Sequence, residues 1–363
     1  MLQKALVLVF VVASITGFTG CGNTANHYIY AAIPAANQII AYREDPNSGV
    51  LTQISGSPYS VGNGAHSLAL HPSGKFLYAA NPGQNENDIS LFTIASNGVL
   101  TEVFPRTSVA PNASLPQFLL MDPGGAFLYV ANAGSNNISV FSIDSSKGSL
   151  TPLTGSPFAI GASPLNMQLT PSGTFLYVTA ASQPLGLIIG FSVNAGTLTA
   201  ASITFSDGAN PNGLAINPAG TFLYAANSSS NSVSIFSISS SGSLQEVPNS
   251  PLSVGTVPVA LLLDPQGKFL YVANQGANTV TAYSINATSG LPDILTTSTT
   301  TGSFGTEGSP SFLVMDPSGK YLYVGNQGTS AGIQAFSVSS GNLTTLSTYG
   351  VGNTPSSIVV LGK

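Results

Sequence analysis

A short block of residues recurs along this chain and constrains its fold more than any other feature. A full copy is His71–Asn81, with the sequence HPSGKFLYAAN, and similar or reduced copies surround six further tyrosines. The intervals between these tyrosines are 48, 51, 48, 47, 47 and 52 residues, for the positions Tyr30, Tyr78, Tyr129, Tyr177, Tyr224, Tyr271 and Tyr323. Repeats of roughly 40–50 residues are typical of β-propellers. The spacing therefore predicts seven copies of one structural unit.

Each repeat contains four short segments with the pattern of β-strands. In the third repeat these segments are Gln117–Met121, Phe127–Ala131, Ile138–Ile143 and Leu150–Leu153. Asp122–Gly125 separates the first two and has the Pro and Gly that a tight turn requires. The third segment alternates apolar and polar residues, as a half-buried strand does. Four strands per repeat, arranged radially, predict one propeller blade per repeat.

The two ends of the repeat region complement each other. The first repeat lacks its first strand, whereas the C-terminal segment Thr354–Val360 matches the first-strand segment Ser309–Met315. The last strand is therefore expected to complete the first blade and close the ring, which removes exposed sheet edges. We predict an all-β, seven-bladed β-propeller with four antiparallel strands per blade, as a single domain over residues 28–363. A WD-type propeller is excluded because the chain has no Trp.

The repeated text also resembles a known family. The block Pro-x-Gly-x-Phe-Leu-Tyr-Val-Ala-Asn and the following strand Ile-Ser-Val-Phe-Ser-Ile are similar to the repeats of the seven-bladed lactonase propellers, which include 6-phosphogluconolactonases. YVTN-type surface propellers share such blocks. The likeness covers residues 28–360. It implies the propeller fold and a funnel in which His, Arg and Glu side chains would hydrolyse a lactone, a carboxylic ester.

The N-terminus resembles an export signal. Lys4 is followed by the apolar stretch Ala5–Ile15 and then by Phe18–Cys21, in which a small residue precedes the only cysteine. This pattern predicts a signal peptide at residues 1–20 and lipidation of Cys21, with residues 21–27 as a lipidated tether. The expected location is the bacterial cell envelope, on the periplasmic or surface side. An ordinary secretory leader and an uncleaved anchor remain the alternatives.

Charge limits the partners of the chain. Only 6% of the residues are charged, the formal net charge is −5, and no run of Lys or Arg occurs. Nucleic-acid binding needs clustered cations and is excluded. Contact with a membrane is expected through the lipid anchor only. We also expect a protein or glycan ligand at the propeller rim. The chain is expected to be a monomer.

Candidate site residues gather at one rim. The segment Ala65–Pro72 resembles an Ala-His-Ser segment of the lactonase family and places His66 where a first strand begins. A hydrolase needs a base for water and a donor for the oxyanion. The catalytic candidates are His66, Arg106 and Glu86. The candidates for a ligand-binding rim are Gln117, Asn212, Asp88, Asp207 and Glu307.

No cofactor or metal site is predicted. Asn85–Asp88 is rich in oxygen ligands but lacks the spacing of a calcium loop. The three histidines, His27, His66 and His71, do not have zinc-binding spacing, and His27 and His71 are expected to lack partners. Gly328–Gly332 matches G-x-S-x-G but joins two strands, so it is interpreted as a loop.

Two functions remain open from the sequence. The sparse ionisable residues of the rim favour a non-catalytic module that binds a protein, a glycan or a small neutral ligand. The alternative is a lactone hydrolase that acts through His66. A phosphorylated lactone would require clustered cations, and only Arg43 and Arg106 supply guanidinium groups.

Overall fold

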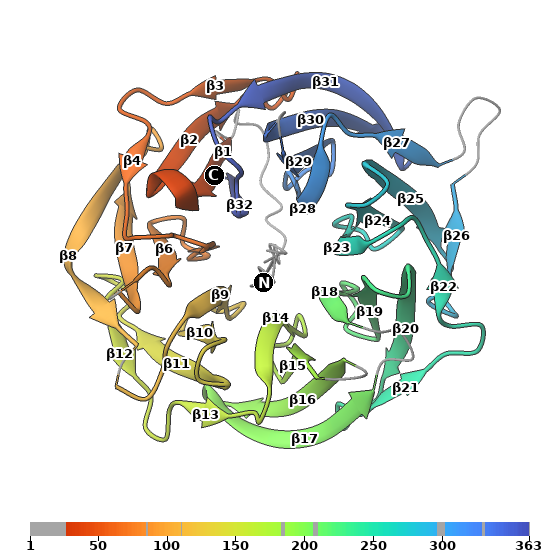
Figure 1. The fold of residues 1–363 in the computed structure, drawn as a ribbon, viewed down its shortest axis with the longest axis horizontal. Helices are drawn as coiled ribbons and strands as arrows, with labels where there is room; N and C mark the ends of the chain where they lie inside the picture. Colours follow the sequence, from red (N-terminus) through yellow and green to blue (C-terminus); the bar gives the residue numbers. More distant parts are fainter. Residues whose placement is uncertain are drawn as a thin grey trace, which may run out of the picture.

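The computed structural model describes residues 27–84, 86–109, 111–182, 186–205, 210–295, 302–328 and 331–362. These residues form seven antiparallel sheets arranged in a ring around a central axis (Figure 1). The one helix among them is a single 3-10 turn, η1 (Pro34–Ala36). The predicted all-β, seven-bladed propeller is confirmed.

Within each blade the strands are ordered from the ring axis outward. The first blade contains β32 (Ser357–Gly362), β1 (His27–Ile33), β2 (Gln38–Glu44), β3 (Leu51–Gln53) and β4 (Tyr59–Ser60). The second contains β5 (Ser67–Leu70), β6 (Phe76–Asn81), β7 (Asp88–Ile94) and β8 (Leu100–Ser108). The third contains β9 (Pro116–Met121), β10 (Phe127–Asn132), β11 (Asn137–Ile143), β12 (Leu150–Pro152) and β13 (Phe158–Ala159). The fourth contains β14 (Ser163–Leu169), β15 (Phe175–Ala181), β16 (Leu187–Asn194) and β17 (Thr197–Phe205).

The remaining three blades follow the same order. The fifth contains β18 (Pro211–Ile216), β19 (Phe222–Asn227), β20 (Ser232–Ile238), β21 (Leu244–Glu246) and β22 (Leu252–Ser253). The sixth contains β23 (Pro258–Leu263), β24 (Phe269–Asn274), β25 (Thr279–Ile285), β26 (Pro292–Ile294) and β27 (Ser303–Gly305). The seventh contains β28 (Ser309–Met315), β29 (Tyr321–Gln327), β30 (Gly332–Ser339) and β31 (Asn342–Gly350).

The C-terminal strand closes the ring, as the repeat alignment predicts. β32 pairs antiparallel with β1, and its partners include Tyr30 opposite Val359 and Tyr28 opposite Leu361. The side chains of Ile358 to Leu361 are buried. Both ends of the described chain therefore contribute strands to one blade, and this blade packs between the second and the seventh blades (Figure 1).

Successive blades are joined by the repeated aromatic residues. The Tyr78 hydroxyl donates to the Gly148 carbonyl of the next blade at 2.7 Å, and the same bond joins Tyr30 to Gly98 and Tyr224 to Gly290. Gly148 has φ +72°, and a Cβ there would lie 2.7 Å from the Phe76 ring. The glycine therefore provides both the left-handed turn and the space for the neighbouring blade.

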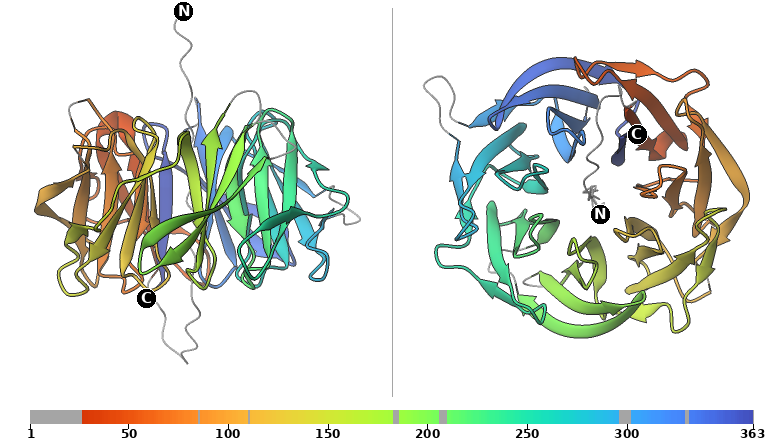
Figure 2. Two further views of the ribbon diagram at one scale, coloured as in Figure 1. Left: turned by 90° about the horizontal axis from the view of Figure 1, so that it is seen from below. Right: turned by 180° about the vertical axis from the view of Figure 1, so that it is seen from behind.

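The ring has two unlike faces, seen edge-on in Figure 2. On the turn face, tight turns such as His71–Gly74 and Asp144–Ser149 join the first strand of a blade to the second and the third to the fourth. The opposite face is called the His66 face, because His66 lies on it. There, loops join the second strand of a blade to the third and lead from each blade into the next. No helix in the described ranges is long and apolar enough to cross a membrane.

Candidate functional site

His66 lies on the His66 face, immediately before the innermost strand of the second blade. Its backbone N–H donates to the Ala80 carbonyl at 2.9 Å, which continues the pairing of β5 with β6. Its ring Nδ1 lies 3.3 Å from the Gln117 carbonyl oxygen of the third blade. The imidazole is half-buried. It therefore sits across the boundary of two blades, at the inner edge of the ring.

Gln117 adds an unsatisfied polar group at this boundary. Its Oε1 atom is buried and has no hydrogen-bond partner among the described residues. A buried acceptor without a donor is costly. The two inner strands are held together just below, where the Leu119 N–H donates to the Ser67 hydroxyl at 3.0 Å. The predicted rim residue Gln117 is thus adjacent to His66.

Arg106 belongs to a second cluster on the outer strands of the same blade. Its Nε donates to Glu102 Oε1 at 2.7 Å, and its Nη1 lies 3.4 Å from Glu86 Oε2. Glu86 also accepts the Asn63 backbone N–H at 2.7 Å. The hydrogen bond from Arg106 to Glu102 continues through Ser90, whose hydroxyl donates to Glu102 at 2.8 Å. The guanidinium is therefore neutralised by two carboxylates.

Asp88 joins this outer cluster. Its Oδ1 accepts the Asn81 side-chain amide at 2.6 Å. Burial raises the pKa of the Asp88 carboxyl, while the hydrogen bond from Asn81 and the charge of Arg106 oppose that shift. Asp88 is therefore held by the protein on the inner side of Arg106.

The strand order separates His66 from Arg106. β5, β6, β7 and β8 follow one another across the sheet, so His66, which immediately precedes β5, and Arg106, on β8, belong to the first and last strands of the blade. Three inter-strand spacings amount to about 14 Å, and Arg106 is bound to Glu102 on its own outer strand. The structure thus brings Glu86 and Arg106 together but places His66 at the opposite edge of the blade. Joint catalysis by His66, Arg106 and Glu86 stays a prediction.

The other predicted rim residues lie around the ring. Asn212, at the start of the fifth blade, donates to the Ser228 hydroxyl at 3.1 Å, and its carbonyl accepts the Thr179 hydroxyl at 3.1 Å. Glu307 is exposed, and its backbone N–H donates to Gln334 Oε1 at 3.0 Å. Asp207 and Cys21 lie outside the described residues. The rim assignments of Asn212, Glu307 and Asp207 stay predictions, as does the lipidation of Cys21.

Two histidines have partners that the sequence did not indicate. His71 is bonded through Nδ1 to the Ser73 hydroxyl at 2.8 Å and through Nε2 to the Gly125 carbonyl at 2.9 Å. His27 Nδ1 lies 3.4 Å from Glu44 Oε2. The expectation that neither histidine has a partner is wrong, because these partners come from turns and strands that only folding brings close.

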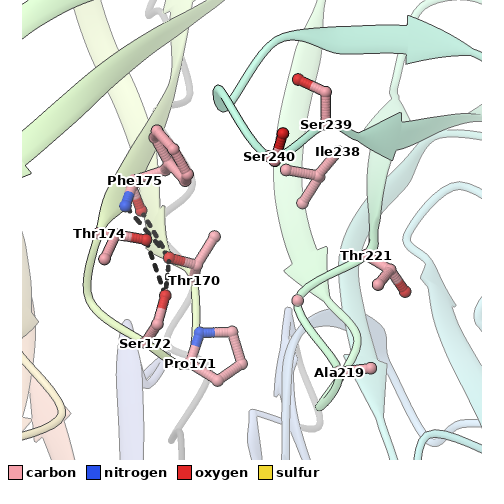
Figure 3. Close-up of a pocket in the computed structure, with 11 residues that line it drawn as sticks. Thr170, Pro171, Ser172, Thr174, Phe175, Ala219, Thr221, Ile238, Ser239 and Ser240 are labelled. Carbon is pink, nitrogen blue, oxygen red and sulfur yellow. Dashed lines mark hydrogen bonds between the residues drawn. The ribbon is translucent and has the colours of Figure 1, made fainter.

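A cavity of about 320 Å³ lies on the turn face, between the fourth and fifth blades (Figure 3). Figure 3 shows that the Thr170–Phe175 turn forms one wall, with Ala219, Thr221 and Ile238–Ser240 opposite. The Thr170 and Ser172 hydroxyls are occupied within that turn. The lining contains no ionisable side chain, so this cavity offers no acid or base for hydrolysis.

Curated relatives match parts of the chain. A 6-phosphogluconolactonase of Formosa agariphila is 40% identical over 101 residues, which cover 28% of each chain. A 6-phosphogluconolactonase of Bacillus subtilis is 28% identical over 35% of this chain and 36% of its own. A third, from Enterobacter sp., is 22% identical over 46% of this chain and 64% of its own. The chain therefore spans less than two thirds of the length of these relatives.

Solved structures match nearly the whole ring. The periplasmic gluconolactonase of Pseudomonas aeruginosa superposes with a TM-score of 0.77 over 93% of this chain and 99% of its own, at 19% identity. A crystal structure from Bacteroides fragilis superposes with a TM-score of 0.79 over 95% of this chain and 100% of its own, at 22% identity. At these identities the structures support the fold.

These matches overturn the expectation of a non-catalytic binding module. The three curated relatives described above are each named 6-phosphogluconolactonase, and one of the matched structures is a gluconolactonase. The expectation rested on the scarcity of ionisable residues at the rim. That scarcity is a weak argument, because one base and a few neutral hydrogen-bond donors are sufficient to attack an activated ester.

The family assignment rests on the repeats as a whole. The family model described as a lactonase with a seven-bladed β-propeller matches residues 23–163, 161–261 and 255–360. These stretches run from before β1 to residue 360, within the closing strand β32. The chain belongs to the seven-bladed β-propeller lactonase family.

Proposed function

We propose that this propeller hydrolyses the lactone of an unphosphorylated sugar acid. The proposed site is the inner edge of the ring, between the second and third blades. The observation that carries the proposal is the position of His66, whose imidazole is held against the Gln117 carbonyl at the inner edge of the His66 face. The names of the curated relatives support the reaction class.

The bond to Gln117 suggests how His66 acts. When Nδ1 carries the ring proton it donates to this carbonyl, and the basic lone pair then lies on Nε2. Nε2 would take a proton from water as the water oxygen attacks the lactone carbonyl carbon. The resulting imidazolium returns the proton to the ring oxygen as the C–O bond breaks, and the product is a hydroxy acid.

The distribution of cations favours a neutral substrate. Five of the six lysines and arginines in the described ranges lie at the turn-face ends of their strands or in its turns: Arg43, Lys75, Lys147, Lys268 and Lys320. Arg106, the sixth, is paired with two carboxylates. A phosphate group is usually held by several cationic donors. We therefore expect a neutral lactone to be the better substrate than its phosphorylated counterpart.

A lactone panel with a His66→Gln variant tests the proposal. The wild-type protein should hydrolyse glucono-lactone faster than 6-phosphogluconolactone, and His66→Gln should lower kcat/KM by about 10²-fold or more, as the loss of a general base does. His71→Gln is the matched control, since His71 lies on the turn face and should retain the activity. Equal activity of wild type and His66→Gln on every lactone would refute the role of His66.

We also propose that the protein is exported and lipid-anchored through Cys21 in the bacterial cell envelope. The apolar stretch before Gly20–Cys21 supports this location, and the periplasmic origin of the matched gluconolactonase agrees with it. Metabolic labelling with a palmitate analogue in a bacterial host should label the wild type and leave Cys21→Ser unlabelled. An unlabelled wild type that is secreted in soluble form would contradict the anchor.

A further inference from the structure

Three ionisable side chains meet inside the protein where the first and seventh blades join. His27 begins β1 and lies opposite Glu44, the last residue of β2. Asp316 follows β28 in a turn of the seventh blade. One ligand atom from each side chain can be chosen so that all three lie within 4.8 Å of one another. The cluster therefore connects both blades next to the strand pair that closes the ring.

The polar atoms of the first blade are not satisfied at this point. Glu44 is 1% exposed, and no hydrogen bond of good geometry reaches either of its carboxylate oxygens from the described residues, so its contacts there are the ion pair with His27 and the neighbouring Tyr323 hydroxyl. His27 Nδ1 has Glu44 as its partner, at 3.4 Å from Oε2. The nearby Tyr323 hydroxyl donates to the Gly49 carbonyl at 3.1 Å. A buried carboxylate in this state costs several kcal/mol unless a cation or donors compensate it.

Asp316 is positioned by its own turn. Its Oδ1 accepts the Tyr321 N–H at 2.7 Å, and its Oδ2 accepts the N–H and the hydroxyl of Ser318. Such outer bonds fix the orientation of a carboxylate and leave it lone pairs for another ligand. Burial raises the pKa of Glu44, and the negative charge of Asp316 adds to that shift. The cluster thus contains two carboxylates and one imidazole.

We propose that His27, Glu44 and Asp316 bind one divalent transition-metal ion, for which zinc is the best chemical fit. One imidazole nitrogen and two carboxylates are a common zinc donor set, whereas calcium takes six to eight oxygens. Ligand atoms bonded tetrahedrally to zinc lie about 3.4 Å apart, and the distance from His27 Nδ1 to Glu44 Oε2 is 3.4 Å. A water would complete the coordination.

The ion would act as a structural clasp. It would connect the first two strands of the N-terminal blade to a turn of the seventh blade, beside the closing strand. An ion that binds only the folded ring stabilises it by mass action, and binding displaces any proton from the ligands. This role is independent of the lactone site, since His66 lies on the other face of the ring.

Zinc titration of the chelator-treated mature chain, residues 21–363, tests the proposal. Calorimetry should detect one saturable site per chain, and saturating zinc should raise the Tm by about 3 °C or more. Glu44→Gln should weaken zinc binding by more than the roughly 10–100-fold that loss of an outer-shell partner costs, because Glu44 would be a direct ligand, and should abolish the Tm shift.

A matched pair of turn variants separates the metal from the fold. Asp264 accepts turn N–H groups from Lys268 and Phe269 in the sixth blade, as Asp316 does in the seventh. Asp316→Asn and Asp264→Asn should therefore disturb equivalent turns, but only Asp316→Asn should lose zinc binding. Absence of a saturable site in the wild type, or unchanged binding in both Glu44→Gln and Asp316→Asn, would overturn the proposal.

Discussion

The repeated tyrosine connects neighbouring blades as well as filling the core. Tyr78 is fully buried, and its hydroxyl crosses to the Gly148 carbonyl of the next blade. Burial raises the pKa of Tyr78, so the hydroxyl retains its proton and remains a donor. The sixth blade differs, because the buried Tyr271 hydroxyl has no partner among the described residues. Tyrosines at equivalent positions of the repeat therefore contribute unequally to the stability of the fold.

This difference predicts a contrast between two conservative variants. Tyr78→Phe should lower the free energy of unfolding by about 1–3 kcal/mol, because it leaves the buried Gly148 carbonyl unpaired. Tyr271→Phe removes a hydroxyl that has no bond to lose, so it should be neutral or slightly stabilising. Denaturant unfolding of both variants measures the contrast. If both variants lose the same free energy of unfolding, the hydrogen bond from Tyr78 to Gly148 does not stabilise the fold.

At the scale of the element, β32 is the strand on which ring closure depends. It is the innermost strand of the first blade, yet it comes from the other end of the chain. Ile358, Val359, Val360 and Leu361 are buried in it. Burial of four such side chains contributes about 6–12 kcal/mol, which is comparable with the whole stability of a typical domain.

Removal of β32 should therefore abolish the closed ring. A chain that ends at Ser356 exposes the edge of β1, and we expect loss of the cooperative thermal transition and association through that edge. A chain that ends at Gly362 keeps the whole strand and serves as the control. Size-exclusion chromatography and thermal unfolding distinguish the two. A monomeric, cooperatively folding chain without β32 would contradict its role as the closing strand.

At the scale of the whole molecule, the ring separates chemistry between its two faces. The His66 face carries His66, Gln117 and the ion-paired Arg106, whereas the turn face carries most of the cations of the described chain and the His27–Glu44–Asp316 cluster. The His66 face therefore has no unpaired cation among the described residues, and the proposed metal site lies on the other face. The proposed hydrolase needs only the first face, and the proposed metal clasp only the second.

Much of this architecture could be predicted from local sequence. The period of the tyrosines determined the number of blades, because each blade buries the same aromatic core and repeats the same turn. The likeness of Thr354–Val360 to Ser309–Met315 also determined how the ring closes. Strand alternation and Pro-Gly turns are local properties, so these predictions required no knowledge of distant contacts.

The candidate sites depended on contacts between residues far apart in the chain. The sequence grouped His66 with Arg106, but the tertiary structure places them on opposite edges of one blade, because each strand adds a spacing outward from the axis. It also treated His27 as isolated, whereas ring closure brings Asp316, far along the chain, to the same buried point as His27 and Glu44. The repeat by itself determined the fold. Only the closed ring decided which of its few ionisable groups meet, because that depends on the path of the chain between blades.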